Sequence, residues 1–181
     1  MKTQPTVEAF ARALVAECGR RLLKESLPRL KKCLAQLTPE EIWYRPNVET
    51  VSVGNLVLHL NGNVRQWILS GLGGAPDTRE RAKEFSEPGP LPTDELLARI
   101  ESTLEEACAV LRQLDPATLL EKRSVQVFEE TGLAILVHVV EHFSYHVGQI
   151  TYFVKSTKAV DLQYYGDLDL EKSARASGGQ S

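Results

Sequence analysis

The chain has 181 residues, a length that favours one domain with a single core of ordinary size. Hydrophobic residues make up 43% of it and charged residues 25%, which is the composition of a globular protein. Because 21 basic residues stand against 24 acidic ones, for a net charge of −3, the chain lacks the basic surface of a nucleic-acid-binding domain. We therefore expect no nucleic-acid partner.

The cysteines and the apolar runs bear on the compartment. Cys18, Cys33 and Cys108 are odd in number and form no CxxC motif, so we expect reduced thiols and a cytoplasmic protein. The N-terminal residues contain no long apolar segment of the kind found in signal peptides. No apolar run approaches the roughly 20 residues that a membrane-spanning helix needs, so we expect no membrane partner.

Residues 7–37 carry apolar side chains at intervals of three and four, the period of an amphipathic helix. Pro28 falls inside this pattern. We expect it to kink or divide the helix, because proline lacks an amide hydrogen and its ring clashes with the preceding turn. A short helix should follow over residues 38–44, where Thr38 can cap the first turn and Glu41 completes a capping box.

A second long helix is predicted from residue 53 to about residue 70. Ser52 can cap it, and a glycine-rich stretch beginning at Gly71 ends it. The residues that follow, up to about Pro92, are rich in proline, glycine, glutamate and arginine, so we expect a polar loop there.

Two more long helices are predicted in the second half of the chain. Thr93 can cap the third, which continues to about residue 114. Residues 124–128 alternate weakly between polar and apolar side chains and indicate a short strand or extended stretch. Thr131 can cap the fourth helix, over residues 132–155.

Four long amphipathic helices with almost no strand signal predict an all-α fold, a four-helix bundle. The loops between the first and second helices and between the second and third are longer than a simple up-and-down bundle needs. They leave room for a crossing connection. We expect the bundle to occupy residues 1–157 and a partly flexible C-terminal tail to occupy residues 158–181.

Three of the four histidines, His138, His142 and His146, follow one another at intervals of four residues. On an α-helix this interval turns about 40° past a full circle and rises about 6 Å, so neighbouring imidazoles lie on one stripe. Two of them can bind one metal ion. His59, in the second long helix, can supply a third nitrogen and leave coordination positions open, as in catalytic rather than structural metal sites.

The spacing does not decide which two of the three histidines act together. Three consecutive turns span about 12 Å, so one ion cannot contact all three rings. His138 with His142, and His142 with His146, are equally good pairs. A single helical histidine is more often a packed or surface residue than a ligand. However, burying several imidazoles without partners is costly, and metal coordination removes that cost.

Two segments resemble the DinB-like (YfiT-like) superfamily of metal-binding four-helix bundles: GNLVLHL at residues 54–60 and HFSYHVGQ at residues 142–149. The resemblance, including the order of helices, covers roughly residues 6–156. It implies that His59, His142 and His146 are the three metal ligands and that His138 is a neighbouring residue. Many members carry an arginine before the Gly-Gln pair, where this chain has Val147, so functions that need this arginine are not implied.

Three further residues are candidates for contacts behind the ligands or with substrate. Gln149 follows His146 by three residues and can orient a ligand or a bound water. Asn63 lies four residues after His59, on the same helix stripe. His138 lies four residues before His142. Each can also be explained as an ordinary residue of a helix surface.

Three neutral imidazoles would leave a divalent ion its full charge, which can acidify a bound water or thiol. We expect Zn²⁺ or Ni²⁺, and the same ligands accept Fe²⁺ or Mn²⁺. The resemblance implies a metal-dependent thiol transferase or hydrolase that acts on a small molecule, with a low-molecular-weight thiol as partner. It also implies a homodimer. The alternatives are a non-catalytic metal-binding stress-response module and an interaction protein whose histidines are only packed.

Overall fold

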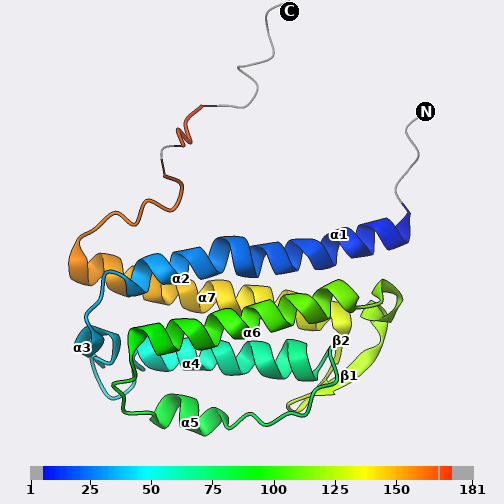
Figure 1. Cartoon of the computed structure of the whole chain (residues 1–181), viewed down its shortest axis with the longest axis horizontal. Coiled ribbons are helices and arrows are strands. Elements are labelled where there is room, and N and C mark those ends of the chain that lie inside the picture. The colour runs from blue at the N-terminus through cyan, green and yellow to red at the C-terminus, as the bar shows by residue number, and fades with distance from the viewer. Residues whose placement is uncertain (1–5, 167, 173–181) are drawn as a thin grey trace, which may run out of the picture.

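The computed structural model describes residues 6–166 and 168–172. Four helical rods lie side by side along most of the chain, with a small hairpin at one end (Figure 1). The elements in chain order, with η for π- and 3-10 helices, are α1 (Val7–Arg20), η1 (Arg21–Ser26), α2 (Leu27–Leu34), α3 (Pro39–Ile42), α4 (Val53–Val64), η2 (Arg65–Ser70), α5 (Arg81–Ser86), α6 (Thr93–Gln113), η3 (Pro116–Leu120), β1 (Lys122–Val125), β2 (Phe128–Thr131) and α7 (Gly132–Lys158).

The first rod contains the division expected at Pro28. Between α1 and α2 the helix widens into the π-helix η1, and the amide of Leu27 donates to the carbonyl of Leu22, five residues back. Pro28 then occupies the first turn of α2, where its missing amide hydrogen costs little. The rod therefore continues past the proline through a change of helix type.

The rods are connected as a bundle with a crossing connection, as the loop lengths suggested. In Figure 1, α4 and α6 both run from left to right, whereas α1–α2 and α7 run from right to left. Residues 71–92 must therefore return along the whole length of α4 before α6 begins. We call these residues the crossing strap. It contains α5, which lies on the outer side of α4 (Figure 1).

Every rod contributes fully buried side chains to one core. Leu30, Leu60, Ile100 and Phe143, one from each rod, have no exposed surface. Burial of such faces supplies most of the stability of a helix in a protein of this kind. The all-α bundle predicted from the sequence is confirmed.

Most of the predicted helix starts are correct and one is wrong. Thr38 and Ser52 form capping boxes with the third residue of their helices, and the Thr131 hydroxyl accepts from the amide of Ala134 at 3.1 Å. Thr93 does not cap α6: Pro92 occupies the N-cap position without a side-chain hydrogen bond. Proline fixes the backbone torsion that leads into the helix. The helix therefore begins at Thr93 itself, one residue earlier than a cap at Thr93 would give.

The extended stretch predicted over residues 124–128 is a hairpin. β1 and β2 pair antiparallel, with Val125 opposite Phe128, so the chain turns in the middle of the predicted strand. Gln126 has a φ of 55°, in the left-handed region that tight turns use. The turn consists of Gln126 and Val127, and because neither is a glycine, the sequence gave no signal of a turn here.

The first part of the predicted tail packs on the bundle. Leu162 is buried, and the Tyr164 hydroxyl lies 3.1 Å from the Cys33 sulfur on α2. Residues 167 and 173–181 lie outside the described residues. Among the helices that the structure describes, none is both long and apolar enough to cross a lipid bilayer.

Candidate metal centre

Two helices bring three histidines together. His59 lies on α4 between the buried side chains of Leu56 and Leu60 and is itself only 5% exposed. His142 and His146 lie one turn apart on α7, each followed directly by a buried core residue, and are partly buried. Because the core stripes of α4 and α7 pack together, the histidine stripes beside them also meet.

The ring nitrogens converge at the distances that one ion requires. Nε2 of His142 lies 3.0 Å from Nε2 of His59 and 3.2 Å from Nε2 of His146. The three candidate ligand atoms all lie within 4.8 Å of one another. Nitrogens bound tetrahedrally to zinc, at about 2.0–2.1 Å from the ion, are separated by about 3.3 Å. Two of the three nitrogen pairs are close to this separation, so the cluster could hold a metal ion.

Two rings of the cluster, His142 and His146, bind protons weakly and are therefore free to bind a metal ion. Burial first, and then the neighbouring groups His146, His59 and His138, lower the pKa of His142 to about 3. Burial also lowers the pKa of His146, although the hydrogen bond that its Nδ1 donates to Gln149 acts in the opposite direction. The rings of His142 and His146 are therefore neutral at ordinary pH, and a neutral ring carries a nitrogen lone pair that a metal can take.

Gln149 contacts the ring of His146 at the nitrogen that does not face the cluster, as the three-residue spacing indicated. Its Oε1 lies 2.7 Å from Nδ1 of His146, and its amide nitrogen donates to the hydroxyl of Tyr145 at 3.2 Å. Nδ1 of His146 is the donor in this pair when Oε1 is the acceptor, which leaves Nε2 unprotonated and facing the cluster.

His138 and Asn63 lie beside the centre and contact each other. The His138 ring stacks on Trp67 with centroids 3.8 Å apart, and its Nε2 lies 3.3 Å from the amide nitrogen of Asn63. Its centroid is 5.3 Å from that of His142. The equal spacing of the three histidines of α7 therefore hides a difference. His142 and His146 turn toward α4 at His59, whereas His138 stacks on the side chain of Trp67.

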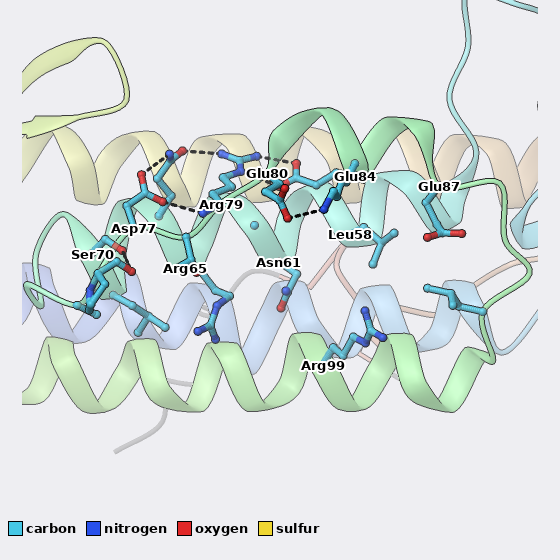
Figure 2. Close-up of a pocket in the computed structure, with 18 residues that line it drawn as sticks. Leu58, Asn61, Arg65, Ser70, Asp77, Arg79, Glu80, Glu84, Glu87 and Arg99 are labelled. Carbon is cyan, nitrogen blue, oxygen red and sulfur yellow. Dashed lines mark hydrogen bonds and ion pairs between the residues drawn. The ribbon is translucent and has the colours of Figure 1, made fainter.

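The crossing strap supplies a carboxylate that the sequence did not indicate. Oε2 of Glu84, on α5, lies 2.9 Å from Nδ1 of His59. Arg79 donates to both oxygens of this carboxylate, at 2.7 and 2.8 Å, and its side chain is only 4% exposed (Figure 2). Burial raises the pKa of Glu84, but the hydrogen bonds from Arg79 and His59 outweigh it, and the pKa lies below its usual value.

No pattern in the sequence could have identified this pair. Arg79 and Glu84 lie in a stretch with no apolar period, 20 and 25 residues after His59. The one local signal is a mixture of acidic and basic side chains, which is typical of any exposed loop. Only the return path of the chain along α4 places them next to His59.

Gln149 also lines a cavity of about 290 Å³. The lining is mainly apolar, with Val51, Ile150 and Phe153, and includes the hydroxyl-bearing residues Tyr44 and Thr50. Since Gln149 both lines this cavity and contacts His146, the cavity lies one side chain away from the histidine cluster.

Comparison with known proteins agrees with this architecture. A comparison with curated protein sequences gives no match. Among solved structures, the chain is similar to the crystal structure of a DinB-like protein, YjoA, from Bacillus subtilis, with a TM-score of 0.62. The two share 20% sequence identity, over 82% of this chain and 96% of that one. At this identity the likeness shows the fold, which is DinB-like.

A sequence family covers almost the same region. Residues 11–166 match the family described as protein of unknown function (DUF1572), which is more than half of the chain and includes all four histidines. The histidine cluster, the crossing strap and all helices except the first four residues of α1 lie inside this match. The chain belongs to the DUF1572 family and has the DinB-like fold.

Proposed function

We propose that this protein binds one divalent transition-metal ion through His59, His142 and His146 and uses it to act on a small molecule. The observation that carries the proposal is the convergence of three Nε2 atoms from two helices, at 3.0 and 3.2 Å. Zn²⁺ and Ni²⁺ suit three imidazole ligands best, and Fe²⁺ and Mn²⁺ are the further candidates.

A metal ion held by three neutral ligands would acidify a bound water or thiol, which is the chemistry of hydrolases and thiol transferases. The chain's own groups would orient the ligands and receive the substrate. Gln149 holds the ring of His146, and the cavity beside Gln149 offers an apolar wall and two hydroxyls to a small molecule. A low-molecular-weight thiol is the co-substrate that we propose for the transferase.

One observation favours a non-catalytic alternative, a metal-binding stress-response module. Within the described residues, the carboxylate that contacts the cluster is Glu84, and both of its oxygens already accept hydrogen bonds from Arg79. A carboxylate held in this way is a poor general base, because its pKa is lowered and its lone pairs are engaged. Turnover would then depend on groups bound to the metal itself.

Metal analysis tests the proposed site. Protein purified without a histidine tag should contain about one transition-metal ion per chain after dialysis against a weak chelator. The double variant His59→Ala, His142→Ala should contain none. His138→Ala is the matched control, because it removes an imidazole from the same helix that does not face His59, and its metal content should equal that of the wild type. Full metal content in the double variant would disprove the site.

A separate assay distinguishes the two functions. The metal-loaded protein is incubated with a panel of low-molecular-weight thiols and a chlorinated aromatic electrophile, and thioether formation is followed by absorbance. A transferase should lose this activity in His142→Ala and keep it in His138→Ala. Hydrolysis of a simple ester is measured in parallel as the test of a hydrolase. Metal binding with neither thioether formation nor ester hydrolysis would favour the stress-response module.

A further inference from the structure

We propose that Glu84 is a positioning residue for the metal centre and that it links the crossing strap to metal binding. In this role the Glu84 carboxylate accepts a hydrogen bond from the Nδ1–H group of His59. The proton then stays on Nδ1, and the lone pair of Nε2 points at the ion. The inference rests on the proposed metal-binding function and adds a part to it that lies outside the three ligands.

Two neighbours compete for Nδ1 of His59. Oε2 of Glu84 lies at 2.9 Å and can only accept, whereas the Nη2 atom of Arg79 lies at 3.1 Å and can only donate. The first contact requires a proton on Nδ1, and the second requires a lone pair there. Glu84 should win, because a carboxylate is the stronger partner and Nη2 of Arg79 already donates to the same Oε2 at 2.8 Å. The tautomer with Nδ1 protonated is the one whose Nε2 can bind a metal.

The Glu84 carboxylate lies at one end of a partly buried chain of hydrogen bonds. Arg79 donates to Oε1 of Gln66 at 2.9 Å, and the Gln66 amide donates to Asp77 at 2.7 Å (Figure 2). Since Gln66 belongs to η2, at the end of α4, this chain attaches the strap to the same rod that carries His59. It fixes the guanidinium of Arg79, which in turn fixes both oxygens of Glu84.

A glycine on α4 makes room for the pair. Gly62 lies three residues after His59, on the face covered by the strap. A Cβ atom at this position would overlap Oε1 of Glu84 and would lie 2.9 Å from Nε of Arg79. Helix interiors disfavour glycine by about 1 kcal/mol relative to alanine. In its observed position beside His59, the carboxylate occupies space that a side chain at residue 62 would fill.

The strap backbone is tied to α4 at the same place. The side-chain amide of Asn55, one turn before His59, donates to the carbonyl oxygens of Glu84 and Glu87, both at 2.9 Å. Arg45 donates to the carbonyl of Phe85 at 2.6 Å, and the Phe85 ring lies 4.8 Å from the His59 ring. Metal binding at Nε2 makes the Nδ1 proton more acidic and strengthens its bond to Glu84. The ion should therefore stabilise the strap.

Zinc affinity, measured by competition with a chelating dye, tests this role. In Glu84→Gln, which keeps the size of the side chain and removes its charge, zinc affinity should fall about 10- to 100-fold. In Gly62→Ala, which keeps every ionisable group and displaces the carboxylate, it should fall in the same direction. Glu80→Gln is the control: Glu80 is 65% exposed and pairs with Lys83, so affinity should not change. Wild-type zinc affinity in both folded variants overturns the proposal.

Two spectroscopic readings separate positioning from a structural role. The ¹H–¹⁵N long-range spectrum of zinc-free protein should show His59 protonated at Nδ1, with a shift toward the Nε2-protonated form in Glu84→Gln. Zinc should slow amide hydrogen exchange in residues 79–87 of the wild type more than in Glu84→Gln. His59 protonated at Nε2 in the wild type, or equal protection of the strap in both proteins, overturns the proposal. Loss of zinc binding in His59→Ala shows independently that the metal site itself is correct.

Discussion

The lowered pKa of His142 makes the stability of the metal-free protein depend on pH. Burial first, and then the neighbouring His146, His59, His138 and Arg79, hold the pKa of His142 at about 3, against 6.5 for an exposed histidine. Between these two pKa values the unfolded chain binds a proton that the folded chain does not. The free energy of unfolding therefore falls as the pH is lowered below about 6.5.

The size of this effect follows from the same pKa values. For a single ring, lowering the pH from 7.5 to 5.5 removes at most about 1.4 kcal/mol of stability. The partial exposure of His142 to solvent reduces this figure. Burial also lowers the pKa of His138 and of His146, so both act in the same direction. The lowered pKa of Glu84 has its effect only below about pH 4.5, outside this window.

Urea denaturation of chelator-treated protein at pH 7.5, 6.5 and 5.5 measures the effect. The unfolding free energy should decrease with pH in the wild type, and His142→Gln should show a smaller decrease, because glutamine does not titrate. His138→Gln provides a comparison at a neighbouring ring that lies outside the cluster. An unfolding free energy that stays constant from pH 7.5 to 5.5, or falls equally in wild type and His142→Gln, would refute the argument that the rings are held neutral.

Three further predictions concern stability. Zinc at a hundred times its dissociation constant should raise the unfolding free energy by about 2.7 kcal/mol, and a chelator should reverse the shift in thermal denaturation. Ile100→Ala removes a fully buried side chain of α6 and should cost about 2–5 kcal/mol in urea denaturation, whereas Ile100→Val should cost about 1 kcal/mol. Thr131→Ala removes the N-cap of α7 and should cost about 1 kcal/mol in the same assay; an unchanged midpoint would argue against the cap.

The local physics of the chain determined much of this protein. The period of its apolar residues and its cap residues predicted four long helices, and the four-residue spacing of His142 and His146 placed both rings on one stripe of α7. Such features are readable in sequence because they depend on neighbours within one or two turns. The lengths of two loops left room for a crossing connection, because length is a property of the chain, but they did not show which loop makes it. The α5 helix within this connection was not predicted, since its six residues are too few to show an apolar period.

Contacts between distant segments were decided only by the tertiary structure. Spacing left His138 and His146 as equal partners for His142, and the resemblance implied the second; the packing of α4 against α7 then brings His59 to 3.0 Å from His142, while His138 stacks on Trp67. Glu84 reaches His59 because the strap returns along α4, at a glycine that leaves it room. A helical period records which face of a helix is buried. It carries no record of which distant side chain will lie against that face.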